Sequence, residues 1–302
     1  MLKTKLMKAG FFGIGMLVLV AVNGMNTQTS IVASATTTNY INPVLKQLQA
    51  LDSSFVCLNE FPDSILAELP KVNLNSQARN YVKTYIQKYG EDLAVIKAKR
   101  GFYFTGIDSI FNMYCLPVQL KYLAVIESEL KTTACSPVGA VGMWQLMAPT
   151  ARLYSLKVNG KYDERTNFYR STKAAARHLK DLYAYYQDWL LVVAAYNSGA
   201  GVVDKAIKFV GSKNYWRIQY KLPAETRGHV KRFIATHYYF ESCGSITTLT
   251  KSEVAAYKTS VTQFISKQKA IAEATAIAKN DVVKENKTVD EIPEVKIEQE
   301  KK

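Results

Sequence analysis

The sequence predicts a mainly α-helical protein. Apolar residues recur at helical spacing, as at Leu120, Leu123 and Leu130, which are three and seven residues apart, and this spacing places them on one face of a helix. Helix-capping residues and glycines separate such stretches along the chain. Segments with strand-like alternation are scarce, and Lys157-Val158 could form at most a small hairpin. With 302 residues, 48% of them apolar, the chain is long enough for one large domain or two small ones.

The first 35 residues have the features of a signal peptide. Three lysines precede an apolar run at 9–22, and Ala33-Ser34-Ala35 matches an A-x-A cleavage site. The apolar run is short for a membrane-spanning helix. We therefore expect cleavage and export to the periplasm or cell envelope, with no stable membrane span afterwards. An uncleaved membrane anchor is the alternative.

The region 36–115 is predicted to be a helical N-terminal extension. Asn73, Asn75 and Ser76 are candidate N-caps for a helix that Gly90 would end. The further elements expected here are a helix at 91–99, an aromatic turn at 101–104 and a helix at 107–113.

The region 116–244 is predicted to be the main helical domain. Leu116-Pro117 opens a helix, because proline suits the first helical turn, and a loop rich in Gly, Ser and Pro follows at 132–142. The later elements expected are a short helix after Pro149-Thr150, a turn at Asn159-Gly160, and helices at 172–186 capped by Ser171, at 189–196 capped by Asp188, at 201–209 and at 224–241.

The tail 245–302 differs from the rest of the chain in composition. Aromatic residues become rare, 254–278 is Ala-, Lys- and Gln-rich and weakly helical, and 280–302 is a mixed-charge run. Such composition buries too little apolar surface to fold by itself. We expect a low-complexity, largely disordered tail that can be removed after Gly244 without loss of stability.

The formal charge of +14 is concentrated in the middle of the chain. The leader has three lysines and no acidic residue, and the tail is near neutral, so about +10 lies between Thr36 and Gly244. A basic exported domain suggests an anionic partner. Because export argues against nucleic acid, we expect an acidic cell-wall polymer or a membrane surface.

Glu127 is a lone carboxylate in the apolar stripe of the helix that Leu116-Pro117 opens. It lies four residues after Leu123 and three before Leu130, so its side chain should be partly removed from water. Desolvation favours the protonated form of a carboxyl group, which suits a general acid. Taken alone, the position also fits a glutamate at the edge of the stripe that reaches for solvent.

Four separated segments form one constellation with Glu127. They are Ile126-Glu127-Ser128, the stretch from Ser136 to Met147, Ala195-Tyr196-Asn197-Ser198-Gly199, and Ala224-Glu225-Thr226-Arg227-Gly228-His229-Val230. In order and spacing they resemble the transglycosylase SLT domain, the lysozyme-like domain of lytic murein transglycosylases. The resemblance covers about 116–241, and 73–122 is similar to the region that precedes this domain in the membrane-bound transglycosylase D group. The tail contains no recognisable LysM repeat, which that group often carries.

The resemblance implies a role for each matching residue. Glu127 would be the sole catalytic acid, and the family usually has tyrosine where this chain has His229. The residues that would bind the saccharide are Ser136, Gln145, Met147, Tyr196, Asn197, Glu225 and His229. No metal or other cofactor is implied.

The implied activity is that of an exported peptidoglycan lytic transglycosylase. It would cleave the β-1,4 bond between N-acetylmuramic acid and N-acetylglucosamine and leave 1,6-anhydro ends, with Glu127 as single acid and base. Glu129 is a poor second carboxylate, because a spacing of two residues turns it to another helix face. The alternatives are a muramidase that uses water, with Glu225 as second carboxylate, and an inactive glycan-binding scaffold.

The four cysteines leave the redox chemistry open. Cys57, Cys115, Cys135 and Cys243 permit two disulfides in three pairings, and their irregular spacing matches no metal motif. Cys135 lies near Glu127 in the sequence but has no obvious histidine partner. We expect structural bridges or small buried thiols rather than a nucleophile.

Overall fold

A computed structural model describes residues 68–289, with side chains described as far as residue 278. The predicted signal peptide and Cys57 lie outside the described residues. Within 68–289 the chain is helical, which confirms the predicted fold class, and the β-structure there is confined to isolated bridges such as Val158 with Asp163. That bridge is the small hairpin expected after Lys157.

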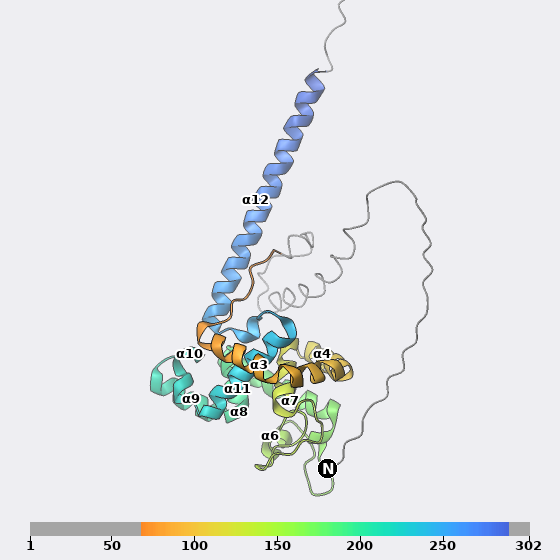
Figure 1. Cartoon of the computed structure of the whole chain (residues 1–302), viewed down its shortest axis with the longest axis vertical. Helices are drawn as coiled ribbons and strands as arrows, with labels where there is room; N and C mark the ends of the chain where they lie inside the picture. Colours follow the sequence, from red (N-terminus) through yellow and green to blue (C-terminus); the bar gives the residue numbers. More distant parts are fainter. Residues whose placement is uncertain (1–67, 290–302) are drawn as a thin grey trace, which may run out of the picture.

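The helices enclose one core, from which a single helix extends. Figure 1 shows α3 to α11 gathered in one body and α12 rising from it as a long rod. In chain order they are α3 (Ser76–Lys99), α4 (Gly101–Met113), η2 (Val118–Lys121), α5 (Tyr122–Ser128), α6 (Ala148–Leu153), η3 (Glu164–Thr166), α7 (Phe168–Tyr186), α8 (Trp189–Ser198), α9 (Ala200–Val210), α10 (Tyr215–Ile218), η4 (Gln219–Lys221), α11 (Ala224–Glu241), η5 (Ile246–Thr248) and α12 (Lys251–Val289).

Helix α8 lies at the centre of the core. Every residue from Trp189 to Ala195 is buried, as expected of a helix that is apolar on all sides. Helices α7, α9 and α11 pack around it, and α11 also packs on α3 and α5. The last turn of α8 therefore holds Tyr196 and Asn197 at a fixed place on the body.

Helix α3 runs further than the sequence predicts. Asn75 caps it as expected, because its side chain accepts a hydrogen bond from the backbone N–H of Gln77. Gly90 does not end the helix, since α3 packs along α11 and this packing outweighs the low helix propensity of glycine. The predicted aromatic turn belongs to α4, because Phe104 is buried in the core.

The caps around α7 and α8 were predicted with mixed success. Asp188 caps α8 as expected, with Oδ1 accepting from the N–H groups of Leu190 and Leu191. Helix α7 begins earlier than predicted, because Asn167 rather than Ser171 provides its cap. The hydroxyl of Ser171 instead donates to the carbonyl oxygen of Asn167.

The start of the tail differs from the sequence prediction. Residues 245–250 are all buried, and Ile246 is part of the core. Helix α12 then continues to Val289, beyond the weakly helical stretch that was expected, and Val254 and Tyr257 pack against the core. A boundary at Gly244 would therefore cut through packed structure. Residues 290–302 lie outside the described part.

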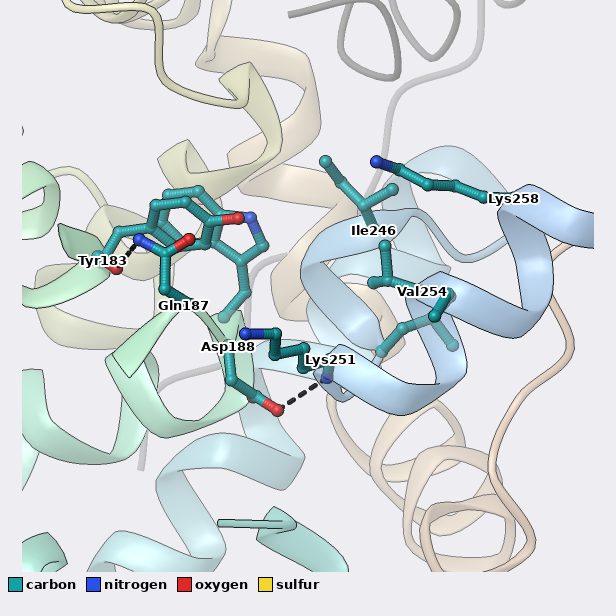
Figure 2. Close-up of a pocket in the computed structure, with 10 residues that line it drawn as sticks. Tyr183, Gln187, Asp188, Ile246, Lys251, Val254 and Lys258 are labelled. Carbon is teal, nitrogen blue, oxygen red and sulfur yellow. Dashed lines mark hydrogen bonds between the residues drawn. The ribbon is translucent and has the colours of Figure 1, made fainter. Parts of the chain in front are cut away.

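Two carboxylates tie the start of α12 to the body. Oδ2 of Asp188 accepts a 2.7 Å hydrogen bond from the backbone N–H of Lys251, drawn in Figure 2. Glu253 accepts from Asn75 at 2.7 Å and from the indole N–H of Trp216 at 3.2 Å. These contacts explain why a segment of low aromatic content is ordered here, because the backbone of Lys251 and the side chain of Glu253 both find partners on the body.

A cavity of about 450 Å³ lies between the start of α8 and the segment 246–258, a junction called the seam below. It is at the Asp188 end of α8, opposite the end that carries Tyr196. Figure 2 shows its lining residues, which are Tyr183, Gln187, Asp188, Trp189, Ile246, Leu249, Lys251, Val254, Ala255 and Lys258.

Candidate active site

Glu127 lies in the last turn of α5, a short helix with a buried apolar face. The helix ends abruptly, because Glu129 and Leu130 both have left-handed backbones with φ of 55° and 67°. The side chain of Glu127 is 16% exposed. The carboxyl group is thus largely removed from water, as the apolar stripe predicts, and still reaches the surface.

His229 contacts this carboxyl group directly. Its Nε2 lies 2.8 Å from Oε1 of Glu127, and its side chain is 2% exposed. The resemblance places His229 among the saccharide-binding residues, whereas in the structure it is enclosed behind Glu127 on α11. Its second ring nitrogen, Nδ1, is buried without a hydrogen-bond partner in the part of the chain described.

Tyr196 approaches Glu127 from the last turn of α8. Its hydroxyl donates a 2.8 Å hydrogen bond to the carbonyl oxygen of Trp144. Burial, and then the negative charge of Glu127, raise the pKa of Tyr196 well above its usual value of 10. Tyr196 is therefore a neutral hydrogen-bonding group beside Glu127, and Asn197 follows it half-buried.

The loop at 134–147 is held by its own polar side chains. Nε2 of Gln145 donates to the carbonyl oxygens of Gly142 at 2.8 Å and Ala134 at 3.3 Å. Oγ of Ser136 accepts from the N–H of Ala140 at 3.0 Å. Both residues were predicted to bind saccharide, and in the structure they first shape the loop.

Arg165 anchors this loop and was missed by the sequence analysis. It is 6% exposed, and its Nη1 donates to the carbonyl oxygens of Gly139 at 2.8 Å and Leu146 at 2.9 Å. Asp163 balances its charge at 2.7 Å. Nothing in the local sequence marks this arginine, because its partners in the loop are backbone atoms 26 and 19 residues earlier.

The backbone of Arg165 leaves no room for a side chain at Gly142. A Cβ atom on Gly142 would lie 2.0 Å from the carbonyl oxygen of Arg165, and φ is +86°. Gly139 has a similar φ of +85° but no atom within 4 Å of such a Cβ. The close approach at Gly142 is therefore by the backbone of Arg165.

Met147 and Glu225 are the outer members of the predicted site. Met147 is 43% exposed, and Glu225 is exposed in the first turn of α11. Glu225 precedes His229 by four residues, so both lie on the same face of α11. The structure therefore gathers Glu127, His229 and Tyr196, with the loop and Glu225 around them.

The described part of the chain shows neither a metal-binding cluster nor a disulfide. Between residues 68 and 278, no group of three His, Cys, Asp or Glu residues could hold a metal ion. Cys115, Cys135 and Cys243 are free and exposed, which differs from the expected bridges or buried thiols. No helix in this span is both long and apolar enough to cross a membrane.

The site thus combines one enclosed carboxyl group, a neighbouring tyrosine and a loop held by Arg165 within a small helical body. Residues 112–219 match the family model described as the transglycosylase SLT domain. This match agrees with the resemblance inferred from the four segments and confirms it for residues 112–219. The matched span includes Glu127, the loop and Tyr196-Asn197 but ends before α11, so Glu225 and His229 lie outside it.

Relatives of this chain include the membrane-bound lytic murein transglycosylase D of Escherichia coli strain K12. The two are 38% identical over 125 residues, which are 40% of this chain and 27% of that protein. The chain therefore matches only about a quarter of the length of this curated relative.

Solved structures provide two further comparisons. The 70 kDa soluble lytic transglycosylase of Escherichia coli aligns with a TM-score of 0.42 at 22% identity, over 48% of this chain and 26% of that one. The lytic transglycosylase Slt of Pseudomonas aeruginosa aligns with a TM-score of 0.43 at 19% identity, over 62% of this chain and 32% of that one.

Proposed function

We propose that this protein is an exported lytic transglycosylase that cleaves peptidoglycan strands in the cell envelope. The observation that carries the proposal is Glu127, a single carboxyl group that is largely enclosed, hydrogen-bonded and yet open to the surface. Its domain type and the name of its curated relative support the same activity.

The chemistry needs one acid that becomes a base. Glu127 donates its proton to the glycosidic oxygen between N-acetylmuramic acid and N-acetylglucosamine, and the bond from C1 of muramic acid to that oxygen breaks. The C6 hydroxyl of the same muramic acid attacks C1, and the Glu127 carboxylate takes the hydroxyl proton. The products are a 1,6-anhydro end and a free C4 hydroxyl, no water is consumed, and Glu127 is protonated again.

The surroundings of Glu127 support a mechanism without a second carboxylate. Glu129 is 61% exposed and pairs with Lys131. Glu225 is exposed on α11, where it has no enclosure like that of Glu127. Tyr196 and Asn197 provide neutral hydrogen-bonding groups, which suit the acetamido and hydroxyl groups of a glycan.

The envelope is the compartment that fits this substrate. The charge of about +10 between Thr36 and Gly244 favours an anionic polymer, and the leader has the features of an export signal. The relative named above is described as membrane-bound.

The deciding experiment is digestion of purified sacculi, with the muropeptides analysed by mass spectrometry. We expect products 18 Da lighter than reducing-end muropeptides, which is the mass of one water molecule. Reducing ends would instead identify a muramidase, and the absence of soluble products would identify a glycan-binding scaffold.

A further inference from the structure

We propose that His229 is a positioning residue that holds one oxygen of Glu127, so that the other oxygen carries the proton to the glycan. The inference rests on the proposed function and assigns a role to a residue outside the matched family segment. It replaces the saccharide contact expected from the sequence.

The two oxygens of Glu127 have different surroundings. Oε1 lies 2.8 Å from Nε2 of His229. Oε2 has no hydrogen-bond partner among residues 68–278. The carboxyl group is thus anchored at one oxygen and free at the other, and the free oxygen is the one available to a substrate.

The ring nitrogen without a partner indicates which tautomer is present. If the ring proton were on Nδ1, an N–H donor would be buried with no acceptor, which is costly. With the proton on Nε2, the ring donates to Oε1 and leaves only a bare acceptor at Nδ1. An N–H donated to Oε1 also directs the carboxyl proton to Oε2, because both protons cannot point along the same line.

The helix that carries His229 is rigid enough to fix this geometry. Its neighbours Thr226, Val230 and Phe233 are 1%, 0% and 0% exposed, and α11 packs on α3, α5 and α8. Enclosure of this kind locks a side-chain rotamer. Because α5 is short and ends in left-handed residues, the contact from α11 is what limits rotation of the Glu127 carboxyl group.

Two substitutions of His229 distinguish the hydrogen bond to Glu127 from the space that the side chain fills. In His229→Gln the amide nitrogen lies about where Nε2 lies, so the donor to Oε1 is kept. In His229→Asn the amide ends about where Nδ1 lies, and the donor cannot reach. A matched control is His237→Asn, because His237 lies two turns further along α11, is also 1% exposed, and does not contact Glu127.

Turnover of soluble glycan strands should depend on whether the side chain at position 229 can donate a hydrogen bond to Oε1 of Glu127. We expect His229→Asn to lower kcat by about tenfold to a hundredfold with KM changed less than about twofold, as for a misplaced catalytic group. His229→Gln should recover most of that loss. His237→Asn should lower the melting temperature without this fall in kcat. Equal kcat losses in His229→Gln and His229→Asn, or a loss mainly in KM, would overturn the proposal.

A second measurement does not depend on any variant. Nitrogen-15 NMR of the imidazole rings in the wild-type protein reports which nitrogen bears the proton, and we expect Nε2 for His229. Observation of the Nδ1–H tautomer would refute the inference.

If Glu127→Gln keeps its activity, the proposed function fails as well; if Glu127→Gln is inactive and His229→Asn is not, the inference about His229 fails alone.

Discussion

The side chain of Glu127 combines two environments that conflict in most proteins. Its side chain is only 16% exposed and contacts His229 on α11, yet it still reaches the surface. Enclosure holds the side chain in one place, and the exposed part leaves room for a ligand to reach it. The proposed catalytic role is therefore assigned to this residue and not to the acidic residues near it.

The carboxyl group of Glu127 can be tested against a neighbour. Glu127→Gln keeps the size of the side chain and removes the proton donor, so activity on sacculi should fall by about a hundredfold to ten-thousandfold. Glu129→Gln is the matched control, because Glu129 is exposed and only two residues away. More than about a tenth of wild-type turnover in Glu127→Gln, or an equal loss in both variants, would contradict the assignment.

The two loop glycines offer a second comparison at this scale. Gly139 and Gly142 have nearly the same φ, so alanine at either position carries a left-handed strain of about 1–2 kcal/mol. Only at Gly142 does the new Cβ meet the carbonyl oxygen of Arg165. Gly142→Ala should therefore lower the free energy of unfolding clearly more than Gly139→Ala in urea titrations. Equal losses would show that the contact with Arg165 relaxes freely.

At the scale of elements, the seam between α8 and α12 decides where the folded domain ends. Ile246 and Leu249 are 1% and 5% exposed, and loss of such side chains from a core typically costs about 2–5 kcal/mol each. Asp188 and Glu253 add hydrogen bonds across the same seam. The segment after Gly244 is thus part of the domain and not an appendage.

Two truncations measure this contribution. A chain that ends at Gly244 should melt at least roughly 10 °C below the full chain, since about 1 kcal/mol corresponds to 2–4 °C in a domain of this size. A chain that ends at Ala278 retains residues 245–250 and the start of α12, so it should melt near the full-length value. Unchanged melting after truncation at Gly244 would support the boundary expected from composition.

Local signals in the sequence were reliable where a structural feature depends only on residues close together in the chain. The cap at Asp188 and the extent of α11 follow from neighbouring residues, and both were predicted. Gly90 and the segment 245–250 were misjudged because their structure depends on α11 and on the core. The motif identified Glu127, but the contact of His229 with its carboxyl group joins residues 102 positions apart, and no local pattern encodes such a contact.

For the whole molecule, buried ionisable groups link stability to pH. Burial lowers the pKa of His178 to about 4 from 6.5, opposed by Asp181. Burial and the charge of Lys121 lower the pKa of His237 to about 3 from 6.5. Burial raises the pKa of Asp188 to about 6 from 3.8, although the hydrogen bonds that it accepts from backbone N–H groups lower it.

The signs of these shifts predict the acid response. Below pH 6.5, unfolding lets both histidines take up protons, so they make stability fall as the pH falls. Between 3.8 and about 6, unfolding releases the proton of Asp188, so this group makes stability fall as the pH rises. For these three groups together the net uptake is about one proton, so their combined effect should raise the unfolding free energy by roughly 1 kcal/mol per pH unit from pH 4 to 6.

Denaturant titrations at several pH values check this balance. Asp188→Asn removes the opposing group and should make the slope about twice as steep, whereas His237→Asn should flatten it. A wild-type slope of opposite sign would mean that Asp188 outweighs both histidines.

The rod formed by α12 has a consequence for reach. Its 39 residues at a rise of 1.5 Å each span about 58 Å, and Asp188 and Glu253 fix its base to the body. The end of the rod at Val289 therefore lies that far from its base, in a direction set by the contacts of Asp188 and Glu253 (Figure 1). A label attached at Val289 would therefore be held away from the body, and from Glu127, by the length of the rod.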